Sequence, residues 1–292
     1  MTALAAPEGR VMVPGPGVYP DLPEEDYHAD PVEGGSLSST GARQLVASCP
    51  AKFRYAQLHP SRPSRAMNLG TAAHQLILQS GPGIVVIKAD NYRTAKAQEQ
   101  RDAAYAAGRT PLLPKEYEQV KEMAARLREH PEASALLDPR RGLTEQTIVW
   151  RDEATGVMQR ARLDHLPYPT ARRMIIADYK TCQSAAPPDI EKAIYDRGYH
   201  QQGEWYTRGV RELGLASRTV FVLICQETEP PYVVTVAEID PPAMRIAEDR
   251  NRKALELYAR CVATDTWPGY STDIEVVSLP AWVKRRMHRE NM

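Results

Sequence analysis

Two segments decide how this chain is interpreted: Arg162–His165 (RLDH) and Ile175–Thr181 (IIADYKT). The second has the apolar run of a buried strand and continues into an acid and a base two residues apart. Because side chains i and i+2 of a strand point to one face, we expect Asp178 and Lys180 to share a face and Tyr179 to point away. A carboxylate there is costly unless it is paired or binds a cation. The segment therefore predicts a site for Mg²⁺ or Mn²⁺.

A second acid supports this interpretation. Asp164 lies 14 residues before Asp178 on the preceding predicted strand, and a hairpin would bring the two carboxylates side by side. Taken alone, a motif as short as D-x-K is more often an exposed ion pair at a strand end. The neighbouring acid and the segments described below favour a site.

Polar and aromatic residues recur on a helix that follows the D-x-K strand. Tyr199, Gln202 and Tyr206 have the spacing i, i+3 and i+7, which places them on one helix face. Upstream, His74 ends the segment Gly70–His74, whose small side chains would let a helix approach the sheet closely. A half-buried core face and an ordinary histidine are the alternative interpretations of these residues.

The composition is that of a folded globular protein. The 292 residues include 37 Lys+Arg against 37 Asp+Glu, with 42% hydrophobic and 25% charged residues, which excludes a disordered chain. No stretch is long and apolar enough for a membrane span, and no signal peptide is recognised, so we expect a cytoplasmic protein. Zero net charge at first argues against nucleic acid, but acidic and basic residues are unevenly distributed along the chain, so their order carries the information.

Periodicity predicts helices that flank a mixed sheet, in a single α/β (α+β) domain. We expect a poorly ordered leader over 1–35 and one domain over 36–270. Its part 36–140 is mainly helical and its part 141–270 holds the catalytic core, and a basic tail follows over 271–292. Helices are expected over 41–47, 51–58, 69–79, 115–129, 188–213 and 241–262, and strands over 84–87, 147–150, 156–166, 173–179, 219–226 and 232–239.

Together these segments resemble the PD-(D/E)xK nuclease superfamily. Within it they are most similar to RecB-type nuclease domains and to RecE-like phage and prophage exonucleases (exodeoxyribonuclease VIII type). The likeness covers 37–269, and it rests on the order and spacing of the motifs rather than on any one of them. The matching motifs are Leu37–Ser39, Cys49–Phe53, Gly70–His74, Glu145, Arg162–Asp164, Asp178–Thr181, Gln202–Tyr206 and Trp267–Gly269.

The resemblance implies a restriction-endonuclease-like core with an N-terminal helical extension, and a role for each matching residue. The metal would be Mg²⁺ or Mn²⁺, present as two ions. Its ligands would be His74, Asp164, Asp178 and the Tyr179 carbonyl. Lys180 would orient the attacking water, and Glu145 would be a further catalytic acid that supports a second ion. Some RecB-type nucleases hold an iron–sulfur cluster, but the four cysteines here lack that spacing, so no cluster is expected.

Basic patches indicate where DNA would bind. Arg43, close to Ser39, is a candidate contact for a terminal 5′-phosphate. A solvated charged face is the alternative interpretation of each patch. The predicted DNA-binding residues are Ser39, Arg43, Lys52, Arg54, Arg162, Gln202 and Tyr206, and Arg62 and Arg65 lie in the same basic stretch.

The resemblance implies a metal-dependent exonuclease that digests linear double-stranded DNA 5′→3′ and leaves 3′ single strands for recombination by annealing. The implied partners are a RecT-like annealing recombinase and further copies of the chain in a ring of three or four, in the cytoplasm of a bacterial host. An endonuclease or single-strand-specific nuclease of the same fold is one alternative. A non-catalytic module that binds DNA ends is another.

Overall fold

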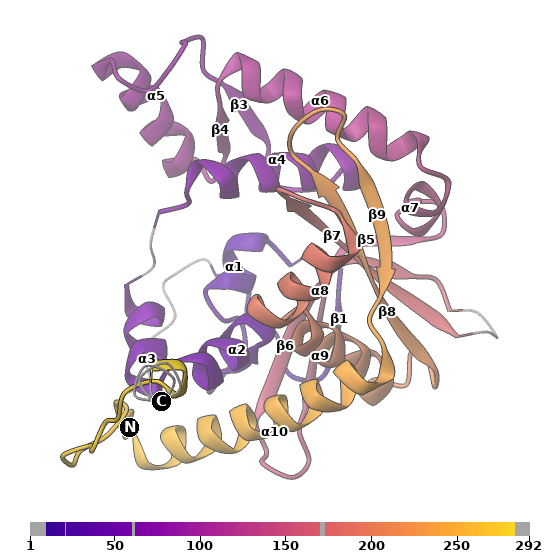
Figure 1. Ribbon diagram of the computed structural model, residues 1–292. Helices are drawn as coiled ribbons and strands as arrows, with labels where there is room; N and C mark the ends of the chain where they lie inside the picture. Colours follow the sequence, from indigo (N-terminus) through magenta and orange to yellow (C-terminus); the bar gives the residue numbers. More distant parts are fainter. Residues whose placement is uncertain (1–9, 21, 60–61, 170–172, 284–292) are drawn as a thin grey trace, which may run out of the picture.

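The computed structural model describes residues 10–20, 22–59, 62–169 and 173–283, and Figure 1 shows its arrangement. Two mixed sheets form the centre. The first has the order β1-β5-β6-β2 and the second the order β7-β8-β9. Within the described residues no helix is long and apolar enough to cross a membrane.

Both sheets contain parallel and antiparallel pairs. In the first, β5 (Gly142–Arg151) pairs antiparallel with β6 (Met158–Pro167), β1 (Gly17–Tyr19) extends the β5 edge, and β2 (Leu37–Ser38) runs parallel to β6. In the second, β7 (Met174–Cys182) runs parallel to β8 (Thr219–Glu227), and β9 (Val234–Glu238) is antiparallel. The predicted mixed α/β class is thus confirmed.

The one central sheet that was expected is divided between β6 and β7. No backbone ladder joins these strands in the described residues; instead the Asp164 carboxylate accepts a 2.7 Å hydrogen bond from the backbone N–H of Tyr179. The expected hairpin neighbours therefore meet through a side chain. The carboxylate takes the N–H that a ladder partner would otherwise use, so the two acids are brought close without strand pairing.

Helices cover both faces of the second sheet (Figure 1). On one face, α4 (Arg65–Leu78) and α6 (Pro114–Glu129) share a buried cluster with Ala177, Tyr179 and Ile224. On the other, α9 (Tyr199–Glu212) and α10 (Pro241–Thr264) share a larger cluster with Ile176 and Phe221 that continues into the first sheet. The remaining helices are α1 (Glu24–His28), α2 (Ser39–Ala47), α3 (Pro50–Leu58), α5 (Ala95–Ala106), α7 (Pro131–Leu136) and α8 (Pro187–Asp196).

The prediction of a poorly ordered leader is wrong for its described part. Strand β1 pairs with β5, and α1 follows it. Tyr27, Val13 and Leu22 are buried in a small apolar cluster with Val149 and Met158. Burying these side chains stabilises the segment although it is rich in proline and glycine. The basic end of the tail, 284–292, lies outside the described residues.

The single long helix expected over 188–213 is two helices, α8 and α9, separated at Gly198. Its φ of +64° ends α8 in the left-handed conformation that glycine adopts without cost. The carbonyl of Arg197 then accepts a 2.7 Å hydrogen bond from Arg43 of α2. The break therefore ties α2 to the start of the helix that carries Gln202.

We predict that Gly198→Ala destabilises the protein more than Gly214→Ala. Both glycines have positive φ, and a side chain there costs about 1–2 kcal/mol. A Cβ at position 198 would lie 2.8 Å from Arg43 Cδ, whereas nothing lies within 4 Å at position 214. Urea unfolding measures the difference; equal losses of unfolding free energy would contradict the role given to the Arg43 contact.

Candidate active site

Three of the predicted catalytic residues, Glu145, Asp164 and Lys180, line one cleft of about 780 Å³ at the junction of β6 and β7, and the fourth, Asp178, is buried beside Lys180. Its walls come from α1, α4, the two strands and the α8–α9 junction. The small side chains of α4 let this helix approach the second sheet closely, as predicted. Ala72 and Ala73 are fully buried against the sheet, and a Cβ at Gly70 would lie 3.3 Å from Thr181 Oγ1. This approach brings His74 to the strands.

Asp178 and Lys180 share one face of β7, as the strand spacing predicts. Lys180 Nζ lies 2.5 Å from Asp178 Oδ2, and Gln202 Nε2 donates a 2.8 Å hydrogen bond to Asp178 Oδ1. Asp178 is fully buried, so its charge is met by one ammonium and one amide. Tyr179 points to the other face, where its hydroxyl donates to Gln226 Oε1 at 2.7 Å.

Helix α9 holds Gln202 in this position. Gly203 packs against Phe221 so closely that a Cβ would lie 2.5 Å from the ring, which lets the helix reach the strand. Gln202 Nε2 also donates to the Tyr206 hydroxyl at 3.0 Å. The predicted polar stripe of α9 is therefore brought to Asp178, where it orients the carboxylate from the buried side.

Lys180 keeps its positive charge in this cleft. Burial alone would lower the pKa of its ammonium, but the charges of Asp178 and Asp164 outweigh burial and raise that pKa. The side chain is still 20% exposed, and Nζ lies 5.4 Å from the centre of the Tyr199 ring. A fixed cation is thus presented to whatever enters the cleft.

A second group of ligand atoms lies beside this pair. One atom from each of His74, Glu145 and Asp164 lies within 4.8 Å of the others, and His74 Nδ1 is 3.6 Å from Asp164 Oδ2. The register of β5 against β6 sets Glu145 opposite Asp164. Glu145 has a φ of +54°, a strained conformation for a residue other than glycine that occurs preferentially at functional sites.

Electrostatics make this group suited to a divalent cation. Burial, reinforced by the charge of Asp178, raises the pKa of Asp164 to about 8. Burial and the charge of Asp164 also raise the pKa of Glu145, while Arg162 binds its Oε2 at 2.8 Å. Burial, and then Lys180, lowers the pKa of His74, which keeps the imidazole neutral and its lone pair free. Two crowded carboxylates and a neutral imidazole fit a cation such as Mg²⁺ or Mn²⁺.

The predicted metal ligands are grouped in the structure partly differently from what was expected. Glu145, expected at a second ion, lies with His74 and Asp164 in the same group. Asp178 is adjacent, but both of its oxygens face Lys180 and Gln202. Its role as a ligand, and that of the Tyr179 carbonyl, remain predictions.

The predicted DNA-binding residues fall into three places. Arg162, Gln202 and Tyr206 lie in or beneath the cleft. Ser39 is buried at the start of α2, its hydroxyl without a partner among the described residues, and the guanidinium of Arg43 is occupied by Arg197, Thr40 and the Ser39 carbonyl. On α3, Lys52 and Arg54 lie against Tyr270 and Trp267 respectively.

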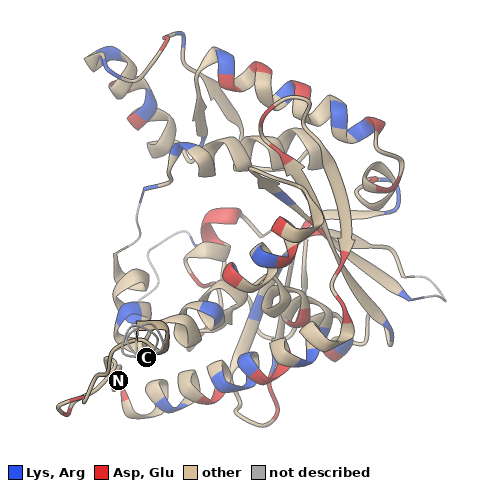
Figure 2. Cartoon of the chain, viewed as in Figure 1, with Lys and Arg blue, Asp and Glu red and all other residues tan. Residues whose placement is uncertain are grey.

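Helix α1 supplies cleft residues that sequence reasoning missed. Glu24, Tyr27 and His28 line the same cleft as His74. The guanidinium carbon of Arg162 lies 6.0 Å from the centre of the Tyr27 ring, in a cation–π contact. Pro23 followed by three acids is a typical helix start and was the available signal. In Figure 2 the acidic helix α1 lies near the centre of the view.

Comparison with known proteins agrees with this site. Residues 38–280 match the family model described as a PDDEXK-like domain of unknown function. The chain belongs to this family. No curated protein matches it in sequence. The predicted PD-(D/E)xK superfamily is thus confirmed, and its nucleases generally use divalent metal ions. The finer likeness to RecE-type enzymes stays a prediction.

A solved structure shares the fold. The crystal structure of a protein from Eubacterium rectale described as a "putative exonuclease" matches with a TM-score of 0.60 and 12% sequence identity. The match covers 90% of this chain and 95% of that one. At this identity the likeness shows the fold alone, which is the restriction-endonuclease-like arrangement expected from the sequence.

We predict that cation binding at pH 7 releases close to one proton. Asp164, with a pKa raised to about 8, holds its proton below that pH until a cation displaces it. Affinity for Mn²⁺ should therefore rise with pH up to about 8 and change little above it. Calorimetric titrations at pH 7 in two buffers of different ionisation enthalpy measure the released proton, with Asp164→Asn as the control. A binding enthalpy independent of buffer would contradict the prediction.

Proposed function

We propose that the protein is a metal-dependent exonuclease that acts on linear double-stranded DNA, 5′→3′, and leaves 3′ single strands. The observation that carries the proposal is that His74, Glu145, Asp164 and Lys180 line one cleft, with Lys180 paired to the buried Asp178. A module that only binds DNA ends would gain nothing from acids buried next to phosphates, since they repel the ligand. Hydrolysis of a phosphodiester accounts for both kinds of charge in the cleft: the acids would bind the cation, and Lys180 would face the phosphate.

The chain's own groups divide the chemistry between them. His74, Glu145 and Asp164 would hold a divalent cation, which when bound stabilises the charge that develops on the phosphate. The Lys180 ammonium, fixed by Asp178, orients a water for in-line attack and lowers the energy of the negative transition state. Gln202 holds Asp178, and Tyr206 holds Gln202 in turn, so they act as positioning residues.

Action on ends is supported by the description of the Eubacterium rectale structure as a "putative exonuclease" and by the resemblance of the motifs to RecE-type enzymes. An exonuclease of this kind would work with an annealing recombinase that takes up the 3′ strands. It would act as a ring of three or four copies, since enclosure of the duplex would keep the enzyme on its substrate. An endonuclease of the same fold would need no end.

We predict that the protein with Mg²⁺ or Mn²⁺ degrades a linear duplex and leaves the covalently closed circle of the same sequence intact. With a duplex labelled at either end, the 5′ label should be released first and the 3′ strand should persist. Denaturing gels of both reactions over time give the result. Cutting of the closed circle would establish the endonuclease, and release from the 3′ label first would contradict the polarity.

Replacement of the central pair should abolish this digestion without unfolding the protein. We expect Asp178→Asn and Lys180→Gln each to lower activity by at least about 10²-fold, because each replaces a charged side chain at the cleft with a neutral one. Asp196→Asn and Lys192→Gln on α8 are matched controls because both side chains are exposed. Circular dichroism checks folding, and activity of the pair variants equal to the controls would contradict the assignment.

A further inference from the structure

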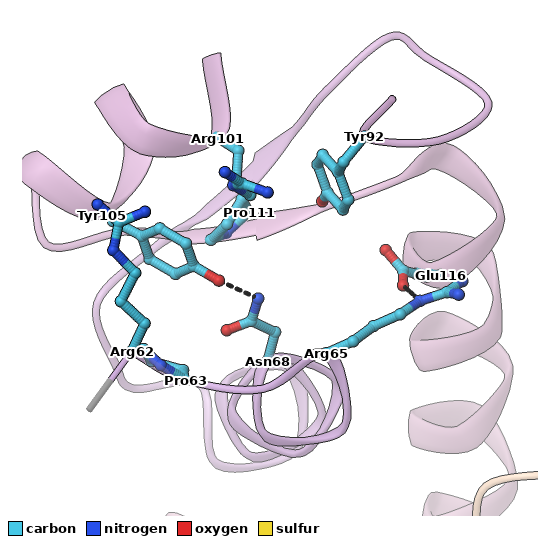
Figure 3. Close-up of a pocket in the computed structure, with 9 residues that line it drawn as sticks. All are labelled: Arg62, Pro63, Arg65, Asn68, Tyr92, Arg101, Tyr105, Pro111 and Glu116. Atoms are coloured by element: carbon cyan, nitrogen blue, oxygen red, sulfur yellow. Dashed lines mark hydrogen bonds and ion pairs between the residues drawn. The ribbon is translucent and has the colours of Figure 1, made fainter. Parts of the chain in front are cut away.

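A second hollow lies on the other side of α4 from the active-site cleft (Figure 3). The first turns of α4 separate the two: Ala66, Met67 and Gly70 line the cleft, whereas Arg65 and Asn68 line the hollow. We call it the arginine pocket. Its lining residues are Arg62, Pro63, Arg65, Asn68, Tyr92, Arg101, Tyr105, Pro111 and Glu116.

Elements distant in sequence build the arginine pocket. Arg65 and Asn68 come from α4, Arg101 and Tyr105 from α5, and Pro111 from β4 (Thr110–Leu112), which pairs with β3 (Ile84–Val86). The buried Asn68 donates a 2.7 Å hydrogen bond to the Tyr105 hydroxyl, which fixes α5 against α4. The pocket is therefore held by packed elements rather than by one loop.

The charges in the pocket favour an anion. Glu116 is satisfied on both oxygens: Oε1 pairs with Arg65, and Oε2 accepts from the backbone N–H of Leu113 at 2.7 Å. Asp102 is shared by Arg101 at 2.9 Å and Arg62 at 3.4 Å. Three guanidinium groups thus face two carboxylates, and the carboxylates hold them in place. One positive charge remains in excess.

The surrounding segment is more basic than the chain as a whole. Residues 62–112 carry seven Lys and Arg against three Asp and Glu, although the full chain is neutral. Figure 2 shows these basic residues along α5 and the approach to α4. A basic region next to a nuclease cleft attracts a phosphate backbone and steers it toward the site.

The pocket also offers a hydroxyl and aromatic faces. The Tyr92 hydroxyl is buried without a hydrogen-bond partner among the described residues, and burial, followed by the charges of Glu116 and Tyr105, raises the pKa of Tyr92 to about 12, so it remains a donor. The Arg101 guanidinium lies 5.6 Å from the centre of the Tyr92 ring. Arginine combined with tyrosine is the usual composition of sites that contact nucleic-acid backbones and bases.

The size of the pocket limits its ligand. Its volume is about 230 Å³, below the roughly 300–1,000 Å³ of sites that enclose a whole small molecule. It is open to solvent on one side of Arg62, whose side chain is 75% exposed. A single phosphate that belongs to a longer chain fits these conditions better than a free ligand that must be enclosed.

Helix α4 sets the spacing between the two sites. Arg65 precedes His74 by nine residues of one helix, an axial distance of about 13 Å at 1.5 Å per residue. One strand of B-form DNA advances about 3.4 Å per nucleotide, so this axial separation corresponds to roughly four nucleotides of a strand. A backbone held in the pocket can therefore reach the active-site carboxylates.

We propose that the arginine pocket binds a backbone phosphate of the nucleic-acid substrate, roughly four nucleotides from the active-site carboxylates. The inference rests on the proposed nuclease function and adds a second anchoring point to it. Arg62 and Arg101 supply the charge, Asp102 orients both, and Tyr92 supplies a hydroxyl donor. Arg65 joins the pocket to α4.

The test compares Arg62→Gln/Arg101→Gln with a control that loses the same charge elsewhere. Lys121→Gln/Arg126→Gln on α6 is that control, because both side chains are exposed, outside the pocket and paired only within their helix. Binding of a fluorescent 30-base-pair duplex in EDTA is followed by anisotropy over a range of salt concentrations. Thermal unfolding checks that each variant is folded.

We expect the pocket variant to bind the duplex about tenfold more weakly than the control, with a salt slope smaller by about one. Arg62→Lys/Arg101→Lys should restore most of the slope. Hydrolysis of bis(p-nitrophenyl) phosphate with Mn²⁺ should be affected far less than that of the duplex, because one phosphate cannot span both sites.

Each contrary outcome has a separate meaning. Equal binding by the pocket and control variants would overturn the proposal. Stabilisation of the wild-type protein by inorganic phosphate, with no difference in duplex binding, would also overturn it by assigning the pocket to a free anion. Wild-type protein that binds the duplex but hydrolyses neither substrate would contradict the proposed function instead, while the anisotropy would still decide the role of the pocket.

Discussion

The candidate site is centred on one hydrogen bond, which the Asp164 carboxylate accepts from the backbone N–H of Tyr179. It joins β6 to β7, between which the described residues form no ladder, so the two sheets meet at a side chain that also belongs to the candidate cation site. Burial at this junction raises the pKa of the carboxyl, because its charged form is costly there without a partner such as a cation. The junction of the sheets and the candidate site thus depend on the same carboxylate, and His74, Glu145 and Lys180 are arranged around it.

Elements with strong apolar periodicity could be predicted from the sequence, and their buried faces explain why. Most of the apolar side chains in the runs of β7 and β8 are buried, as is the stripe of α6, so pattern and packing agree. Helix α5 was missed because its buried side chains are only Ala97 and Ala104, too small to produce a stripe. The break at Gly198 was missed because an isolated glycine is tolerated within a helix. The leader was misjudged because β1 and α1 are stabilised by β5, a contact that only the folded chain supplies.

The candidate site was predictable where local geometry decides it. Alternation along a strand put Asp178 and Lys180 on one face, and helix spacing put Gln202 and Tyr206 together. The grouping of Glu145 with His74 depends on strand register and on a positive φ, neither of which the residue types reveal. The arginine pocket combines Arg62, Arg101 and Glu116 from separate elements. The net charge of the whole chain did not reveal the basic segment around this pocket, because acidic residues elsewhere in the sequence cancel its positive charge.

We infer that the junction of β6 and β7 is a centre for a divalent cation. Anomalous diffraction from crystals soaked in Mn²⁺ can locate the ion. We expect an anomalous peak within bonding distance of His74, Glu145 and Asp164, and we expect it to be lost in Asp164→Asn crystals. No peak in this cleft, or a peak only at surface acids, would contradict it.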